Sequence, residues 1–167
     1  MFDCFRPHEF AESFMEIGYD ALYAKGIRGL AFDVDNTLEG YEADIPSAQT
    51  ADFLKSLVSR GFAVCFVSNN GKERIERFNS GLAFSAIHKS GKPKKSALKR
   101  ASERMGVPID QIAMIGDQLF TDVFCGRRSR AYTVLVRPVT GYDPLIVKVK
   151  RVPERMLLKL YKRTKLN

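Results

Sequence analysis

The chain has 167 residues, a net charge of +8 and an apolar content of 45%. This length allows one domain with a proper hydrophobic core, and no apolar run approaches the roughly 20 residues that a membrane-spanning helix needs. The first residues lack a signal-peptide pattern, and the cysteines Cys4, Cys65 and Cys125 are too far apart for a C-x-x-C motif. We therefore expect a reduced, cytoplasmic protein in which Cys65 and Cys125 are small core residues.

Apolar spacing and helix-breaking residues predict helices that alternate with short strands. A leading helix over about 9–25 ends at Gly26. The expected strands are 27–32, 62–67, 83–87, 111–115 and 132–136. The helices between them are expected at about 46–60, 71–78, 93–105 and from 121 onward. Strands separated by helices pair in parallel, so we predict one α/β domain with a five-stranded parallel sheet flanked by helices.

Two aspartates one residue apart, Asp33 and Asp35, follow directly after the first of these strands. The carboxyl ends of parallel strands form the edge at which open α/β sheets place their active sites. Two carboxylates on one loop can hold a hard cation such as Mg²⁺, or can serve as nucleophile and as general acid and base. Taken alone, the Asp-x-Asp pattern is equally typical of a turn or a helix cap.

Polar side chains also follow other predicted strands. Ser68 and Asn69 follow the second strand, and Asp117 follows the fourth, with Asp122 five residues later. Lys92 lies at the opening of the helix after the third strand. In a parallel sheet these positions converge on one crevice, where clustered carboxylates repel one another unless a cation lies among them. The sequence therefore predicts a Mg²⁺ site beside side chains that can bind a phosphoryl group.

The order of these residues resembles the four motifs of the haloacid dehalogenase-like (HAD) phosphohydrolases. The matching segments are 33–37, 67–70, 92–93 and 116–122. Their residues are similar to those of subfamily IIIA, in the YqeG-like branch that is related to the mitochondrial phosphatidylglycerophosphate phosphatases. The resemblance implies a HAD-like Rossmannoid domain and hydrolysis of phosphate monoesters.

The resemblance also implies a role for each matching acidic residue. Asp33 is the expected nucleophile, which becomes an aspartyl phosphate, and Asp35 is the expected general acid and base. The expected Mg²⁺ ligands are the Asp33 carboxylate, the Asp35 backbone carbonyl and Asp117. Asp122 is expected to orient metal-bound water, although a carboxylate that only favours a helix N-terminus fits the sequence as well. Thr37 is expected to brace the loop.

Phosphoryl oxygens are expected to contact Ser68, Lys92 and an amide of Asn69. Lys94 and Lys95 compete with Lys92 for the lysine role, and the Lys-Pro match favours Lys92.

The chain has no room for a cap domain, the insertion that gives many members of this family their selectivity. About 29 residues separate Leu38 from Val67, and 21 residues separate Asn70 from Lys92. Predicted loops, helices and a strand use both intervals. We therefore expect an open active site that admits a phosphate displayed on something large.

The positive charge is concentrated between Arg137 and Asn167, where nine lysines or arginines accompany two acidic residues. We expect a HAD-like domain over 1–140 and a basic tail over 141–167. From Pro153 to about 166, apolar and basic residues gather on opposite faces of a helix, which is the pattern of an interfacial membrane helix. A helix that packs its apolar face on the domain fits the pattern equally well.

Three functions fit these features. The first is a Mg²⁺-dependent phosphatase in peripheral contact with a membrane, with the anionic phospholipid phosphatidylglycerophosphate as substrate. The second is a phosphatase on nucleotides or nucleic-acid ends, although no aromatic stacking platform lies among the basic residues. The third is a non-catalytic, RNA- or ribosome-associated module, which the retention of every acidic motif residue disfavours. The sequence predicts no oligomeric state.

Overall fold

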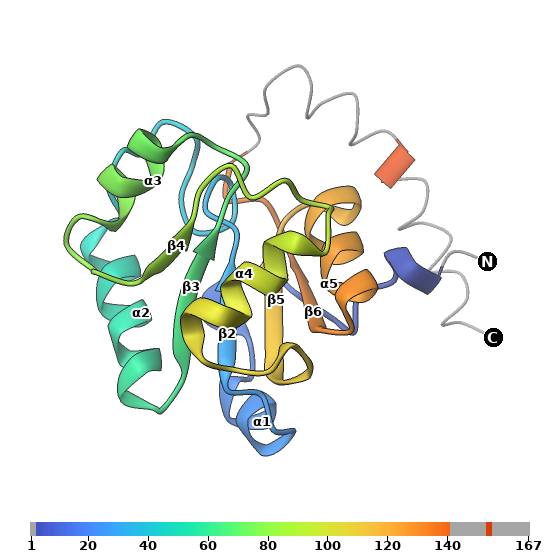
Figure 1. Cartoon of the computed structure of the whole chain (residues 1–167). Helices are drawn as coiled ribbons and strands as arrows, with labels where there is room; N and C mark the ends of the chain where they lie inside the picture. The colour runs from blue at the N-terminus through green and yellow to red at the C-terminus, as the bar shows by residue number, and fades with distance from the viewer. Residues whose placement is uncertain (1–2, 141–152, 155–167) are drawn as a thin grey trace.

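The central sheet has six strands, and every pairing between neighbouring strands is parallel. The computed structural model describes residues 3–140 and 153–154 (Figure 1). The strands are β1 (Glu9–Ala11), β2 (Gly29–Phe32), β3 (Ala63–Val67), β4 (Ser85–Ile87), β5 (Ile112–Gly116) and β6 (Tyr132–Val136). They lie in the order β1-β6-β5-β2-β3-β4, so β2 and β5, which carry acidic motifs at their ends, are neighbours in the sheet.

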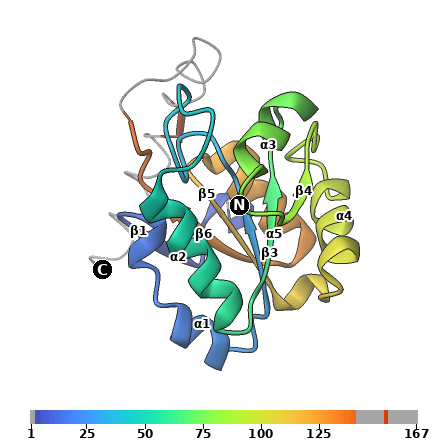
Figure 2. The ribbon, with the colours of Figure 1, turned by 90° about the vertical axis from the view of Figure 1, so that its left-hand side faces the viewer.

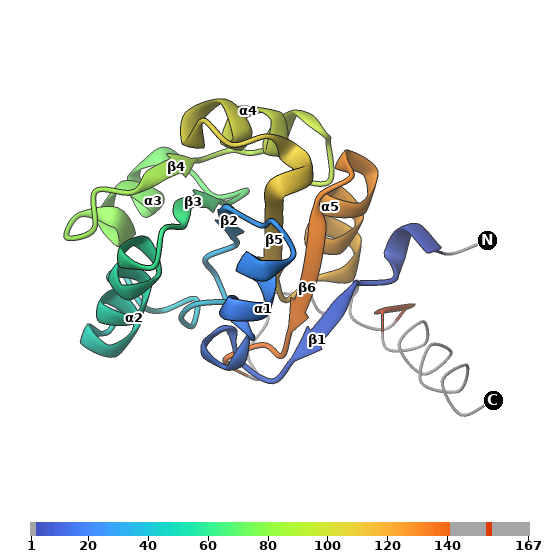
Figure 3. The same cartoon turned by 90° about the horizontal axis from the view of Figure 1, so that it is seen from below.

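Helices cover both faces of this sheet (Figures 2 and 3). They are α1 (Tyr19–Ala24), α2 (Ala48–Ser59), α3 (Lys72–Asn79), α4 (Ser96–Met105) and α5 (Phe124–Ser129). Buried residues of α1, α2 and α3 pack in one core, and those of α4 and α5 pack in the other. The α/β fold with a parallel sheet between helices is thus confirmed.

The central strand β2 serves both cores, and all four of its residues are buried. Leu30 and Phe32 belong to the core under α1, α2 and α3, while Ala31 belongs to the core under α4 and α5. Successive side chains of a strand point to opposite faces, so a strand covered on both sides requires an unbroken apolar run. Cys65 and Cys125 are core residues, as predicted, and burial raises the pKa of their thiols to about 12 and about 11.

Two helix boundaries lie where capping residues in the sequence predict them. α2 begins after Ser47, whose Oγ accepts a hydrogen bond from the Thr50 N–H at 3.2 Å. This contact satisfies a backbone donor that the first turn of a helix leaves unpaired. α4 ends at Gly106, which adopts the left-handed conformation with a φ of 66°. Glycine takes this conformation without the steric cost that a Cβ adds.

The helix predicted over about 9–25 is wrong in its first half, and the sheet has six strands instead of five. Glu9–Ala11 form the edge strand β1, which pairs with β6. Ser13 then caps a short 3-10 helix (Phe14–Glu16), and α1 follows. The apolar spacing imitates a helix, but hydrogen bonds to β6 from far along the chain decide the conformation.

Two predicted helix starts are also wrong. The helix predicted over 93–105 begins at Ser96, because the residues before it form turns. The helix predicted from Thr121 begins earlier, with a π-helical turn at Leu119–Val123 that continues into α5. Both differences lie beside the motif residues, where the chain departs from regular structure.

No cap domain interrupts residues 3–140, as predicted. Residues 33–47 form the loop between β2 and α2, and residues 68–95 hold α3, β4 and their connections. At the carboxyl ends of the strands, toward the top of Figure 1, this part of the chain therefore inserts no domain.

The predicted basic tail lies outside the described residues, apart from the helical pair 153–154. The boundary at 140 and the amphipathic helix over 153–166 therefore stay predictions. Within that pair, Glu154 is buried, and its Oε1 accepts a hydrogen bond from the Phe120 N–H at 3.1 Å.

Among the helices described, none combines the length and the apolar character needed to cross a bilayer.

Candidate active site

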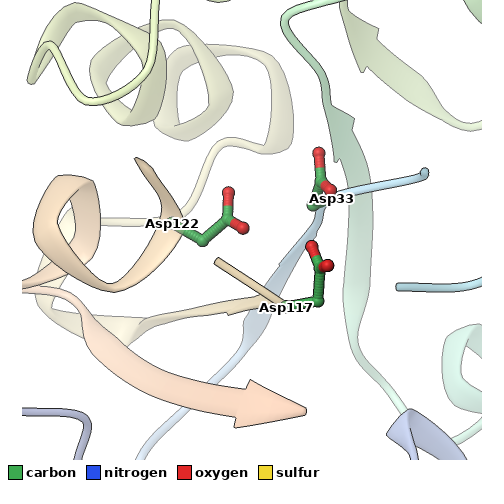
Figure 4. A group of neighbouring side chains, drawn as sticks. All are labelled: Asp33, Asp117 and Asp122. Atoms are coloured by element: carbon green, nitrogen blue, oxygen red, sulfur yellow. The ribbon is translucent and has the colours of Figure 1, made fainter. Parts of the chain in front are cut away.

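Three buried aspartates from two neighbouring strand ends meet at the carboxyl edge of the sheet. Asp33 follows β2, Asp117 follows β5, and Asp122 lies in the π-helical turn after β5. Each offers a carboxylate oxygen within 4.8 Å of the others, and the side chains surround one space (Figure 4). This group is called the carboxylate cluster below. These are three of the four aspartates predicted to meet at the strand ends, and the carboxylate of the fourth, Asp35, is not part of this group.

The π-helical turn at Leu119–Val123 places Asp122 in the cluster. Asp122 is 1% exposed, and its Oδ2 accepts a hydrogen bond from the Gln118 N–H at 3.1 Å. Such single wide turns are frequent at functional sites, because they re-aim a side chain without ending the helix. The carboxylate of Asp122 therefore faces Asp33 and Asp117 instead of only favouring a helix N-terminus.

Lys92 reaches into the carboxylate cluster from the loop before α4. Its Nζ donates a hydrogen bond to Asp33 Oδ1 at 2.6 Å and lies 2.7 Å from Asp122 Oδ1. The Lys92 side chain is 2% exposed, whereas Lys94 and Lys95 are exposed to solvent. The structure thus brings Lys92, and not its two competitors, to the acidic residues.

The carboxylate cluster and Lys92 together hold more acidic groups than basic ones. Burial raises the pKa of the Asp33 carboxyl well above its ordinary value; the Lys92 ammonium opposes this rise, and the Asp122 and Asp117 carboxylates add to it. Burial by itself would lower the pKa of Lys92, but Asp122 and Asp33 outweigh that effect and raise it. The charged form of Lys92 is therefore favoured, and its single charge does not neutralise three carboxylates.

The carboxylate cluster fits a divalent cation. Asp122 Oδ1 is buried, and within the described part of the chain no donor makes a well-oriented hydrogen bond to it. This oxygen forms an ion pair with Lys92, whose Nζ lies 2.7 Å away. With all groups ionised, three carboxylates and one ammonium leave two negative charges, which one divalent cation would neutralise. Carboxylate oxygens are the ligands that Mg²⁺ prefers.

Thr37 lies between two members of the cluster. Its Oγ1 is 3.4 Å from Asp33 Oδ2 and 3.4 Å from Asp117 Oδ1. These long contacts link the loop after β2 to the end of β5, which agrees with the bracing role predicted for Thr37.

Ser68 and Asn69 lie at the end of β3, beside the lysine loop. Ser68 is buried, and its Oγ accepts a hydrogen bond from the Asn70 N–H at 3.1 Å. The Asn69 side chain is engaged with the lysine loop: its Oδ1 accepts from the Lys92 N–H at 2.9 Å and from Ser90 Oγ at 2.7 Å. Its Nδ2 donates to the Lys92 carbonyl at 3.2 Å. The Asn69 side chain thus holds Lys92 in place.

Asp35 has two partners that sequence reasoning did not assign. Its Oδ2 accepts a hydrogen bond from Asn70 Nδ2 at 2.6 Å, and its Oδ1 accepts one from Arg74 Nη2 at 3.0 Å. Asn70 belongs to the segment 67–70, which resembles the second family motif, but the resemblance implies no role for its side chain. No sequence signal distinguishes Arg74 from the other cations of α3, since only the packing of α3 against the loop after β2 brings it to Asp35.

The carboxylate cluster depends on a glycine at the end of β5. A Cβ added to Gly116 would collide with the carboxyl group of Asp122. We expect Gly116→Ala to push Asp122 out of place and to weaken Mg²⁺ binding by about 10- to 100-fold, the usual cost of disturbing groups that orient metal ligands. The Mg²⁺ concentration that gives half of the Mg²⁺-induced rise in Tm measures the effect. Gly81→Ala is the control, because no atom lies within 4 Å of its added Cβ; equal half-saturation in both variants would contradict the prediction.

Comparison with known proteins adds independent information. A family model described as HAD-hydrolase-like matches residues 89–141. Probable phosphatase YqeG of Bacillus subtilis is 33% identical over 159 residues, which cover 95% of this chain and 92% of that protein. Phosphatidylglycerophosphate phosphatase 1, chloroplastic/mitochondrial, of Arabidopsis thaliana is 28% identical over 168 residues. That alignment covers 94% of this chain but 48% of the Arabidopsis protein, so the chain spans about half of that relative's length.

Solved structures share the fold at low sequence identity. The cobalt-bound deoxy-D-mannose-octulosonate 8-phosphate phosphatase of Haemophilus influenzae has a TM-score of 0.55 and 19% identity, over 75% of each chain. The magnesium-bound HAD-hydrolase YfnB of Bacillus subtilis has a TM-score of 0.53 and 16% identity, over 71% of this chain and 90% of that chain. These two structures therefore share the overall α/β fold of this chain.

Proposed function

Because this chain belongs to the YqeG-like branch of the haloacid dehalogenase-like phosphatases, we propose that it cleaves phosphate monoesters through an aspartyl-phosphate intermediate with Mg²⁺ as cofactor. The predicted family and the predicted class of enzyme, a phosphate-monoester hydrolase, are confirmed by the 33% identity to YqeG over nearly the whole chain. The observation that carries the mechanism is the carboxylate cluster, which lies beside the buried ammonium of Lys92.

In the first proposed step, a carboxylate oxygen of Asp33 attacks phosphorus, and the bond between phosphorus and the leaving oxygen breaks. Asp35, in its protonated form, gives its proton to that oxygen, so an alcohol departs. In the second step, a water oxygen attacks the phosphorus of the aspartyl phosphate while the Asp35 carboxylate takes a proton from the water. The bond between the Asp33 oxygen and phosphorus breaks, inorganic phosphate leaves, and both aspartates return to their starting forms.

The proposed Mg²⁺ ligands are the Asp33 carboxylate, the Asp35 backbone carbonyl and Asp117, with Asp122 orienting bound water. The bound cation supplies positive charge that polarises the phosphoryl oxygens and lets Asp33 ionise. Lys92 Nζ lies 2.6 Å from the nucleophile, so it is suited to hold a phosphoryl oxygen next to Asp33. Ser68 is the second proposed phosphoryl contact. Asn69 would contribute its backbone N–H, since its side chain holds Lys92.

Metal binding is expected to stabilise the protein as well as activate it. With free Mg²⁺ at about 100 times its dissociation constant, the folded state gains about 2.7 kcal/mol, which a thermal melt detects as a higher Tm. Asp117→Asn is expected to lose most of this shift. Asp110→Asn, a change at an exposed aspartate away from the cluster, is the control that keeps it. An equal Tm shift in both variants would place the cation elsewhere.

The proposed substrate is phosphatidylglycerophosphate, presented at a membrane surface. Two observations support a lipid phosphate. One is the 28% identity to the Arabidopsis phosphatase of that name, and the other is the lack of a cap domain within residues 3–140. An open site can reach a phosphate that protrudes from a bilayer. Peripheral contact through the basic tail is part of this proposal and concerns residues outside the described part.

The test is Mg²⁺-dependent phosphate release from phosphatidylglycerophosphate in mixed micelles, with Asp33→Asn as the blank. The proposal expects turnover that vanishes in the blank and exceeds turnover of nucleotides and nucleic-acid ends presented at equal phosphate concentration. Phosphate release from soluble monoesters without release from the lipid would keep the chemistry and reject the substrate. A lack of Asp33-dependent release from every ester would reject both.

A further inference from the structure

We propose that Arg74 is the positioning residue that orients Asp35 for proton transfer, an inference that rests on the proposed function. Arg74 lies in the first turn of α3, outside the four motifs that resemble the HAD family. Its Nη2 donates a hydrogen bond to Asp35 Oδ1 at 3.0 Å, while Asn70 Nδ2 donates to Oδ2 at 2.6 Å. Both oxygens of the proposed acid and base are thus held from one side, by α3 and the loop before it.

The pair formed by Arg74 and Asp35 is shielded from water. The side chains are 15% and 8% exposed, so their attraction is screened less than that of a surface pair. Nη1 of Arg74 is buried and finds no acceptor in the described part of the chain. Leaving a buried donor unpaired is unfavourable, so fold stability alone is a poor account of an arginine at this position. Orientation of Asp35 accounts for it.

Arg77, one turn further along α3, provides a comparison, because its ion pair is exposed to solvent. It also pairs with an aspartate, but its Nε lies 3.4 Å from Asp44 Oδ1, and the side chains are 58% and 67% exposed. Pairs of this kind contribute little. α3 therefore carries two Arg–Asp pairs of contrasting character, and the shielded one involves the residue that must transfer protons.

The position of Asp35 matters because the same carboxyl group must reach the leaving oxygen in the first step and a water in the second. Misplacing a reacting group by about 1 Å can lower a rate by about 100-fold. No inserted cap domain within residues 3–140 is present to hold Asp35. In this chain Arg74, in α3, and Asn70, in the loop before it, orient Asp35.

The experiment compares esters whose leaving groups differ in their need for a proton. An alkyl phosphate releases a strongly basic oxygen that must be protonated, whereas p-nitrophenyl phosphate releases a stable anion. Arg74→Met is expected to lower kcat/KM for glycerol 3-phosphate by about 100-fold and for p-nitrophenyl phosphate by less than 10-fold. Arg77→Met, the matched control, is expected to leave both values within about twofold. Arg74→Lys should restore part of the alkyl activity.

A double-mutant cycle separates positioning from a structural role. If Arg74 acts through Asp35, Arg74→Met has no further effect on alkyl phosphate turnover in an Asp35→Asn background. Additive losses, or equal losses for the two esters, would overturn the proposal. Should Arg74→Met fail to fold, as judged by its Tm, Asn70→Ala and Arg74→Lys take its place in both comparisons. Asp33-dependent turnover of p-nitrophenyl phosphate by the unaltered protein tests the proposed function separately, and its absence would overturn both.

Discussion

Replacing Asp33 with asparagine is expected to abolish phosphate release while leaving a folded protein. An amide oxygen cannot form the acyl phosphate, so we expect kcat to fall by at least about four orders of magnitude, as for other enzymes that lose their nucleophile. This is the largest loss of turnover that we expect from any single substitution, and the surroundings of Asp33 support its role. It lies at the end of the central strand β2, 2.6 Å from Lys92 Nζ and within the carboxylate cluster.

The same substitution is expected to stabilise the metal-free protein. Burial, together with Asp122 and Asp117, makes the ionised form of Asp33 unfavourable in spite of Lys92, as its raised pKa shows. Asparagine removes that charge, and Lys92 keeps its ion pair with Asp122. Each 1 kcal/mol of relief corresponds to a rise in Tm of about 2–4 °C for a chain of this size. A loss of activity together with a gain in stability would show that the buried charge of Asp33 is unfavourable for folding but needed for activity.

The measurements are phosphate release with Mg²⁺ and thermal melts with a chelator present. Asp110→Asn is the control for an exposed aspartate and should change neither value. Turnover by Asp33→Asn within 100-fold of the unaltered protein would contradict the nucleophile assignment. A lower Tm for the metal-free variant would show that its ion pair with Lys92 outweighs the repulsion.

Replacing Lys92 with methionine is expected to damage both turnover and folding. The change leaves Asp33, Asp117 and Asp122 buried together without their cation, and breaking a buried ion pair from one side costs about 3–5 kcal/mol. Turnover should fall by about 100- to 1,000-fold, the usual loss when a preorganised group that stabilises transition-state charge is removed. Added Mg²⁺ should recover part of the stability but little of the activity, since the phosphoryl contact is lost.

Lys94→Met and Lys95→Met are matched controls, because these lysines belong to the same loop but are exposed. Urea unfolding with and without Mg²⁺ reports stability, and kcat/KM reports catalysis. We expect both controls to stay within about 0.5 kcal/mol and twofold of the unaltered protein. A control variant as damaged as Lys92→Met would show that the loop, rather than the buried ammonium, is what the site requires.

Motif spacing alone predicted that acidic residues would lie together at the carboxyl ends of the strands. Asp33 after β2 and Asp117 after β5 lie in one cluster because parallel strands end at one edge of a sheet. This inference needs no contact information, since it follows from strand order and from which residues come directly after each apolar run. The family and the enzyme class followed from the same motifs.

The edge of the sheet and the partners of Asp35 could not be predicted in this way. β1 is a strand because it pairs with β6, more than a hundred residues away, and local spacing suggests a helix. Arg74 reaches Asp35 because α3 packs beside the loop after β2. Such pairings depend on contacts between distant segments, which hydrophobic periodicity does not encode.

The sequence by itself determined the family and the enzyme class, because four motifs resemble those of the haloacid dehalogenase-like phosphohydrolases in order and spacing. Only the tertiary structure decided which lysine reaches the carboxylates, that the Asn69 side chain holds Lys92, and that Arg74 holds Asp35. Residue identity fixes which atoms can react. Burial and distance, which set the strength of each electrostatic contact, exist only once the strands and helices have packed.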